Sequence, residues 1–313
     1  MSSQQIDDAC RQACEQIGVD YQPVAADGVW HVANLSDDHK GKNDARIKLF
    51  PDRQGGIVWN HKSGERQTFF INRIQQGETL SHEERARIEG EKRRREAELL
   101  QRHNKAAKRA KSLWDNASPA PASHPYLVRK HVKPHWLRVA TWERLILQEN
   151  RKHTKLVIEN ALLVPLYNAS GAIRSLQAIF PAKSPELDRD KDMLAGGGLA
   201  GLFWWIGAKS ETVLICEGFA TGATLHEETG HRVYIAFTTN NLLAVGQLLR
   251  DKLPDAKLVF CADNDTQTTG NPGLTKATEA AQAVGGLLAV PPVAGDFNDW
   301  AVSLRGGNHE HAA

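Results

Sequence analysis

Short apolar runs that end on acidic residues mark the C-terminal third of the chain. The run 213–216 (Val-Leu-Ile-Cys) ends on Glu217, and the run 258–262 ends on Asp263-Asn264-Asp265. Both runs are rich in β-branched or aromatic residues, which is typical of strands buried on both faces of a parallel sheet. Open parallel sheets carry their functional groups at the carboxyl ends of the strands. The pattern therefore predicts that these acids lie at one edge of a sheet.

Helical patterns alternate with the apolar runs. Pro272 stands near the start of one of them, where proline is favoured. Alternation of strands and helices favours a parallel sheet with right-handed crossovers, so the predicted fold class is α/β. The predicted helices cover 221–229, 241–253 and 272–284, and the further strands cover 233–237 and 286–290.

The N-terminal part of the chain has a different pattern. A helical period over 6–17 precedes four short strand candidates, which are separated by turn formers such as Asp27-Gly28 and Ser63-Gly64. A small antiparallel sheet is predicted, with strands over 30–35, 46–50, 56–59 and 68–71. From residue 85 to 111 basic residues outnumber acidic ones, which predicts a long basic helix.

Composition and net charge are those of an ordinary soluble protein. The chain has 313 residues, 24% of them charged and 41% hydrophobic, and its net charge of +2 gives no strong nucleic-acid signal. No apolar stretch approaches the roughly 18 residues of a membrane span, and the first residues do not start a signal peptide, so a cytoplasmic protein with no membrane partner is predicted. Cys10 and Cys14 have no second Cys or His pair at zinc-finger spacing, so no zinc is predicted.

Three motifs, each after an apolar run, resemble the Toprim domain. They are 216–222 (Cys-Glu-Gly-Phe-Ala-Thr-Gly), 262–265 (Ala-Asp-Asn-Asp) and 296–299 (Asp-Phe-Asn-Asp). Toprim domains occur in DnaG-type primases, topoisomerases, recombination proteins and some nucleases, and the form seen here is similar to the primases of plasmids and bacteriophages. The resemblance covers residues 114–302 well and residues 20–72 loosely. It implies a Toprim-like, Rossmannoid parallel sheet with helices on both faces, preceded by the small antiparallel β module and the long basic helix.

This resemblance also implies a division of the chain into five parts. The expected parts are a small α+β module in the position of a zinc ribbon (1–77), a basic helical connector (78–117), the N-terminal part of a primase core (118–210), the Toprim domain (211–304) and a flexible tail (305–313).

The resemblance assigns the acids to a metal site that holds Mg²⁺ or Mn²⁺, with two or more ions. Such hard cations prefer carboxylate oxygens. Gly218 is expected to permit a tight turn that points the preceding carboxylate outward. A lone Asp is often a turn former, and Asp299 could simply cap the helix that follows. The implied roles are metal binding for Asp263 and Asp265, metal or triphosphate binding for Asp296 and Asp299, and metal binding or general base catalysis for Glu217.

Several basic and aromatic residues are candidates for binding nucleotides or DNA. The resemblance places Arg174 and Lys191 among residues that face the active centre, and Lys276 could meet phosphate. The run Lys92-Arg93-Arg94-Arg95 could lie along a DNA backbone, or it could belong to a solvated connector held by i,i+4 ion pairs. Trp59, among basic neighbours, could stack on bases of a single strand, or the aromatic residues could form the core of the small sheet.

The function implied by the resemblance is that of a DNA primase, which makes short RNA primers on single-stranded DNA from NTPs in plasmid or phage replication or transfer. No Gly-x-x-x-x-Gly-Lys-Ser/Thr motif occurs, so unwinding would come from a partner such as a separate replicative helicase. Two alternatives stay open. One is a metal-dependent nuclease of the Toprim family, and the other is a non-catalytic protein that binds single-stranded DNA or recruits partners.

Overall fold

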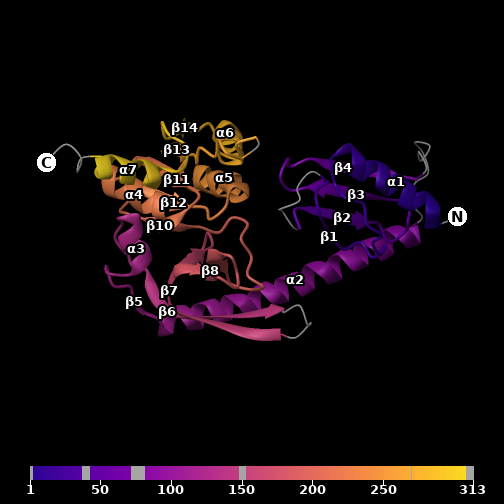
Figure 1. The fold of residues 1–313 in the computed structure, drawn as a ribbon, viewed down its shortest axis with the longest axis horizontal. Coiled ribbons are helices and arrows are strands. Elements are labelled where there is room, and N and C mark those ends of the chain that lie inside the picture. The colour runs from indigo at the N-terminus through magenta and orange to yellow at the C-terminus, as the bar shows by residue number, and fades with distance from the viewer. Residues whose placement is uncertain (1–2, 37–42, 72–81, 148–152, 269, 308–313) are drawn as a thin grey trace. The chain divides into compact units, whose positions relative to one another are not determined.

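The chain divides into two compact units, Met1–Glu89 and Gly90–Ala313 (Figure 1). The five-part division expected from the sequence is finer and stays a prediction. Helix α7 (Phe297–Gly307) continues into the stretch that was expected to be a tail. Among the described residues, every helix is too short or too polar to traverse a bilayer. The computed structural model describes residues 3–36, 43–71, 82–147, 153–268 and 270–307.

The first unit is a helix packed on a four-stranded antiparallel sheet of order β1-β2-β3-β4, as predicted. Cys10 and Cys14 lie one turn apart on α1 and are buried against the sheet as free thiols. Ile47 and Val58 are fully buried beneath them. The elements are α1 (Ser3–Gln16), β1 (His31–Ala33), β2 (Ala45–Leu49), β3 (Gly55–Asn60) and β4 (Arg66–Phe70).

The long basic helix is present as α2 (His82–Asn116), with 35 residues. Its C-terminal turns carry an apolar stripe: Ala106, Ala110 and Trp114, spaced by four residues, are buried against the second unit's antiparallel sheet. Tertiary packing therefore fixes the C-terminal end of α2, while Lys92 to Leu100 stay largely exposed.

The second unit contains an antiparallel sheet of order β5-β6-β7-β8-β9. A hairpin turn lies between 167 and 173, where the side chain of Asn168 accepts hydrogen bonds from the backbone of Ser170 and Ala172. The elements are β5 (Ser118–Pro119), α3 (Pro125–Lys130), β6 (Arg138–Leu147), β7 (His153–Tyr167), β8 (Ile173–Ser184) and β9 (Arg189–Met193).

The second sheet of this unit has the predicted parallel arrangement, in the order β10-β12-β11-β13-β14. Its edge strand β10 is antiparallel, because it enters directly from the neighbouring sheet without a crossover helix. Helices α4 and α7 cover one face, and α5 and α6 cover the other. The elements are β10 (Trp204–Ile206), β11 (Thr212–Cys216), α4 (Phe219–Thr229), β12 (Arg232–Ile235), a 3₁₀ turn η1 (Thr239–Asn241), α5 (Leu242–Lys252), β13 (Lys257–Cys261), α6 (Pro272–Val284) and β14 (Leu287–Ala289).

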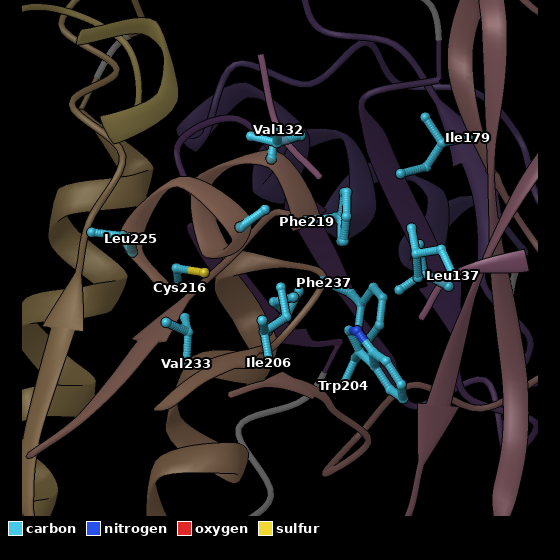
Figure 2. Packing of buried hydrophobic residues seen from close by; sticks show 14 of the residues in the cluster. Val132, Leu137, Ile179, Trp204, Ile206, Cys216, Phe219, Leu225, Val233 and Phe237 are labelled. Carbon is cyan, nitrogen blue, oxygen red and sulfur yellow. The ribbon is translucent and has the colours of Figure 1, made fainter. Parts of the chain in front are cut away.

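One hydrophobic core joins the two sheets of the second unit (Figure 2). Leu162 and Ile179 of the antiparallel sheet pack in the same cluster as Leu214 and Val233 of the parallel sheet. Phe219, the first residue of α4, is fully buried in it. Because interiors are close-packed, this shared core fixes the strand ends of one sheet relative to those of the other.

Gly222 lets α4 approach the parallel sheet closely. A Cβ at this position would lie 2.8 Å from Cγ1 of Ile235 and 3.2 Å from Sγ of Cys216. We expect Gly222→Ala to lower the free energy of unfolding by about 1–3 kcal/mol, because overpacking outweighs the gain in helix propensity. Gly90→Ala, on a helix with no atom within 4 Å of the added methyl group, is the matched control and should raise stability by up to about 1 kcal/mol. Urea titration of both variants tests this, and equal stabilisation by the two would contradict it.

Candidate active site

The predicted acids gather at the carboxyl edge of the parallel sheet. Glu217 directly follows β11, and Asp263 follows β13 after one residue. These two strands are neighbours, and Ile215 pairs with Phe260 in the register. Two residues further along each strand, Glu217 is therefore level with Ala262, and it lies next to Asp263. This pairing explains why the two acids lie at one edge of the sheet, as the sequence predicted.

The loops that carry the other acids are joined by backbone hydrogen bonds. Asn264 and Gly295 exchange two bonds, of 2.9 and 3.0 Å, which link the loop after β13 to the segment before α7. The amide of Asp265 donates to the side chain of Asn271, which also donates to the side chain of Asn264. A Cβ at Gly273, in the first turn of α6, would lie 2.7 Å from the carbonyl oxygen of Asp263 and 3.0 Å from Oδ2 of Asp265, so the absence of a side chain there lets α6 start close to the acids.

Asp296 and Asp299 form a reciprocal cap at the start of α7. The Asp299 amide donates to Oδ1 of Asp296 at 2.8 Å, and the Asp296 amide donates to Oδ2 of Asp299 at 3.4 Å. Thr221 of α4 donates to Oδ2 of Asp296 at 3.0 Å, and Lys130 of α3 pairs with Oδ1 of Asp299 at 3.0 Å. The capping role considered from the sequence is thus present, and metal binding by these two acids stays a prediction.

Burial and like charge act together on the two central carboxyl groups. Burial, with Asp263 close by, raises the pKa of Glu217 to about 7. Burial, with Asp296 and Asp265 close by, raises the pKa of Asp263 to about 7. Lys191 on β9 opposes both shifts, and this lysine comes from the other sheet. Perturbed acids of this kind cluster at functional sites.

Asp263 also carries an unsatisfied buried atom. Its Oδ1 is buried and has no hydrogen-bond partner among the described residues. An acceptor left unpaired in this way costs free energy, and such atoms in native proteins point to a missing ion, water or ligand.

The explanation expected for Gly218 is wrong. Its φ of −103° and ψ of 157° are extended backbone, which any residue adopts, so no glycine-specific turn points Glu217 outward. A Cβ there would have a single neighbour, Oγ1 of Thr221 at 3.7 Å. The glycine keeps the start of α4 free of a side chain.

The three predicted phosphate-binding residues have different surroundings. Lys191 acts on both central acids, as described above. Arg174 on β8 donates to the side chain of Asn104 on α2, and Lys276 pairs with Glu279 on the exposed face of α6 at 2.7 Å. Neither of these two is among the main causes of the pKa shifts of Glu217 or Asp263.

Sequence reasoning missed a buried carboxylate beside Lys191. Asp192 accepts hydrogen bonds from Nε1 of Trp142 at 3.0 Å, from Arg144 at 3.2 Å and from Arg189 at 2.6 Å. Asp192 and its two arginine partners line a hollow of about 470 Å³ that also includes Lys191. The signal in the sequence is weak, because Trp142 and Arg144 come from β6, which lies far from Asp192 along the chain.

The predicted DNA-binding run on α2 consists of exposed side chains. Arg94 lies 3.6 Å from Glu98, and Arg95 lies 3.9 Å from Glu91, both at i,i+4 spacing. Ion pairs at this spacing are the ones expected if α2 is a solvated connector, which is one of the two alternatives for this run that the sequence left open. Lys92 and Arg93 are exposed as well.

Trp59 lies on the face of the first unit's sheet that α1 does not cover. It pairs across the strands with Arg46 and Arg66, and the Arg66 guanidinium lies 4.1 Å from its ring centroid. His61 stacks on the same ring at 3.9 Å, and Trp30 lies 6.0 Å away. The pKa of His61 is lowered by partial burial and by the nearby Arg46. The residues Trp30, Arg46, Trp59, His61 and Arg66 are called the aromatic-basic face below.

Residues 212–306 match the family model of the Toprim domain. This part of the chain is a Toprim domain. The predicted resemblance is therefore confirmed for the region that carries the acids.

Two curated relatives extend the similarity beyond the Toprim domain. The chain is 29% identical over 306 residues to a "DNA primase TraC" of Escherichia coli, covering 91% of this chain and 26% of that protein. It is 28% identical over 279 residues to a second Escherichia coli "DNA primase TraC", covering 85% of this chain and 18% of that protein. The chain thus spans about a quarter or less of the length of these relatives.

A solved structure described as the DnaG primase catalytic domain bound to ssDNA is also similar. It aligns with a TM-score of 0.46 and 13% identity, over 69% of this chain and 78% of that chain.

The raised pKa of Asp263 predicts that the metal-free chain loses stability as pH rises. Below about pH 4 the group is protonated in both the folded and the unfolded state. Between there and about pH 7 the unfolded state alone gives up the proton, so folding becomes less favourable. We expect Asp263→Asn, in a chelator, to raise the free energy of unfolding by about 1–3 kcal/mol at pH 8 and little at pH 4.

Urea titrations across this pH range measure the effect. Asp255→Asn, which changes an exposed carboxylate of the same domain, is the matched control and should leave the pH profile unchanged. A gain for Asp263→Asn that is the same at pH 4 and pH 8 would contradict the repulsion.

Proposed function

We propose that this chain carries the active centre of a DNA primase. It would make short RNA primers on single-stranded DNA by metal-dependent nucleotidyl transfer, in plasmid or phage replication or transfer. The observation that carries the proposal is the pair Glu217 and Asp263, whose pKa values are both raised to about 7 at the edge of a Toprim domain. Curated relatives that include this region are named DNA primases, which supports the same reaction.

The acids fit a divalent cation of the magnesium type. Among the described residues, no three His, Cys, Asp or Glu side chains converge as a complete ligand set. Mg²⁺ does not need one, because it keeps several waters and is held by one or two carboxylates plus substrate phosphates. The unpaired Oδ1 of Asp263 and the repulsion from Glu217 fit a site that a cation would stabilise. We assign Asp263 and Asp265 to Mg²⁺ or Mn²⁺, and Asp296 and Asp299 to a further ion or the triphosphate.

Each protein residue then has a defined task. When bound, such ions neutralise the triphosphate and acidify the attacking 3′-hydroxyl. Glu217, with a pKa of about 7, is suited to accept the hydroxyl proton at neutral pH. Lys191 offers a positive charge to the phosphates from the facing sheet, and Thr221 holds Asp296 in place.

Template binding is proposed for the aromatic-basic face and for α2. Proteins that hold single strands combine a basic surface with aromatic rings on which bases stack. Trp59, flanked by Arg46 and Arg66, has this composition. The exposed run Lys92 to Arg95 adds positive charge that would neutralise phosphates. NTPs are the proposed substrates, and a separate replicative helicase is the proposed source of unwound template.

Asp263→Asn is expected to abolish primer synthesis. The assay uses single-stranded DNA, labelled NTPs and Mg²⁺ or Mn²⁺, and short labelled products are resolved on a gel. Losing one carboxylate at a cation site that also positions the substrate should reduce the rate by at least about 100-fold. Asp255→Asn should retain the wild-type rate, and a chelator should stop both active proteins.

Reaction products other than primers would indicate a different function for the chain. Template shortening that Asp263→Asn abolishes, without primers, would identify a nuclease. DNA binding without either product would identify a non-catalytic binding protein. Cation binding is checked separately by thermal denaturation at pH 8. Mn²⁺ should raise the midpoint of the wild-type chain and not that of Asp263→Asn.

Trp59→Ala is expected to weaken binding of a labelled single-stranded oligonucleotide by about 5- to 100-fold, because stacking on one base is lost. Trp59→Phe should restore most of the affinity, since it keeps an aromatic face. Val32→Ala removes an exposed apolar side chain of the same sheet and serves as the matched control. Fluorescence anisotropy measures all four proteins, and unchanged affinity for Trp59→Ala would exclude stacking at this face.

A further inference from the structure

Trp136 is the most exposed large hydrophobic side chain among the described residues. Its exposed fraction is 89%, and the next is Leu145 at 67%. It lies at the end of the segment Lys130 to Trp136, which leads from α3 to β6 and is called the Trp136 segment below. A ring this large on the surface gives up the free energy of burial, so its position calls for a physical explanation.

The backbone of the Trp136 segment is held in conformations that side chains disfavour. His131, His135 and Trp136 have φ values of 52°, 44° and 68°. Left-handed conformations at non-glycine residues persist only where the surrounding structure enforces them, and they are common at ligand-binding sites. Glycine at position 136 would adopt the same φ without strain.

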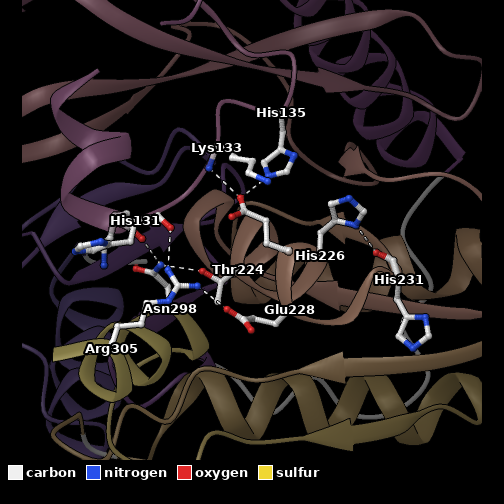
Figure 3. A network of polar contacts seen from close by, with 11 residues as sticks. His131, Lys133, His135, Thr224, His226, Glu228, His231, Asn298 and Arg305 are labelled. Atoms are coloured by element: carbon white, nitrogen blue, oxygen red, sulfur yellow. Dashed lines mark hydrogen bonds and ion pairs between the residues drawn. The ribbon is translucent and has the colours of Figure 1, made fainter. Parts of the chain in front are cut away.

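Hydrogen bonds from α4 and α7 enforce this conformation (Figure 3). Asn298 of α7 donates to the carbonyl of Lys130 at 2.7 Å, and Arg305 donates to the carbonyl of His131 at 3.1 Å. Glu227 of α4 accepts from the amide of Lys133 at 2.9 Å and contacts Nε2 of His135 at 2.6 Å. The segment is thus fixed before any ligand arrives, which reduces the entropy lost on binding.

The Trp136 segment itself is basic, and the acids that contact it, Glu227 and Asp299, come from α4 and α7. No Asp or Glu occurs from residue 116 to residue 142. His131 and Lys133 are exposed, and the Lys133 side chain forms no ion pair within the described part of the chain. At its other end Lys130 pairs with Asp299, one of the candidate acids. The segment therefore runs from the edge of the acid cluster to the exposed ring.

We propose that Trp136 is a stacking platform for one base of a single-stranded nucleic acid, with Lys133 on the adjoining phosphate. The combination of one rigid, fully presented aromatic ring and nearby cations is that of single-strand binding surfaces. An aromatic anchor for a protein partner would more typically sit in a ring of apolar contacts. This inference rests on the proposed function and deepens it, because it defines the path of the strand next to the acids.

The test compares Trp136→Gly, Trp136→Phe and Lys133→Ala in binding a fluorescent 20-nucleotide oligo-dT, by anisotropy at about 50 and 200 mM salt. Trp136→Gly should weaken binding by about 5- to 100-fold with an unchanged salt dependence, because it removes stacking and no phosphate contact. Trp136→Phe should bind within about threefold of wild type. Lys133→Ala should lower the slope of log affinity against log salt by about 1.

Loss of folding is not expected to account for weaker DNA binding by Trp136→Gly. Glycine relieves the left-handed strain at position 136, so the thermal midpoint of Trp136→Gly should not fall. Val128→Ala, which trims a side chain of α3 that is 57% exposed, is the matched control and should bind like wild type. Binding of Trp136→Gly within twofold of wild type at both salt concentrations would overturn the inference, and so would an equal loss in Trp136→Phe.

The same proteins separate this inference from the primase proposal. If wild type binds DNA but makes no primers, the primase proposal fails, and the binding series still decides the role of Trp136. If wild type makes primers and Trp136→Gly has an unchanged KM for template, the inference fails and the primase proposal stands. A wild-type chain that binds no single-stranded DNA would overturn the inference outright.

Discussion

The repulsion between buried carboxyl groups is the constraint on which the rest of the site depends. Glu217 and Asp263 follow adjacent parallel strands, so the sheet itself forces them together, and burial removes the water that would otherwise screen them. Two buried carboxyl groups this close together destabilise the folded state unless a positive charge lies beside them. Lys191 supplies part of this charge from the facing sheet, while Oδ1 of Asp263 has no hydrogen-bond partner among the described residues.

A frame of neutral hydrogen bonds keeps the acids in place against this repulsion. The backbone pair of Asn264 and Gly295 ties two acidic loops together, and Asn271 fixes the first of them through its side chain. Thr221 performs the same task for Asp296. None of these groups adds charge. The electrostatic character of the site is therefore set by the acids, Lys191 and Lys130, while the geometry is set by the frame.

Local patterns were enough to predict the parallel sheet and its acidic edge, because apolar runs such as 258–262 and the acids after them are adjacent in sequence. The helix 272–284 was also predicted to its exact bounds, since Pro272 and Gly285 mark its ends. Contacts between the sheets could not be predicted in this way. Arg174 and Lys191 looked equivalent in the sequence, yet only tertiary packing decides which of them faces the acids. The exposure of Trp136 was equally invisible, because a lone tryptophan ordinarily indicates a core.

Two helices connect the acid cluster to the Trp136 segment. Helix α4 starts just after Glu217 and carries Glu227 in its last turn, whereas α7 starts with the Asp296–Asp299 cap and carries Arg305 in its last turn. The first turns thus position the acids, and the last turns hold the strained backbone that presents Trp136. Because a helix is stiff along its axis, both groups of residues move as one body. A strand that rests on Trp136 would therefore be held at a fixed distance from the acids without any further contact between them.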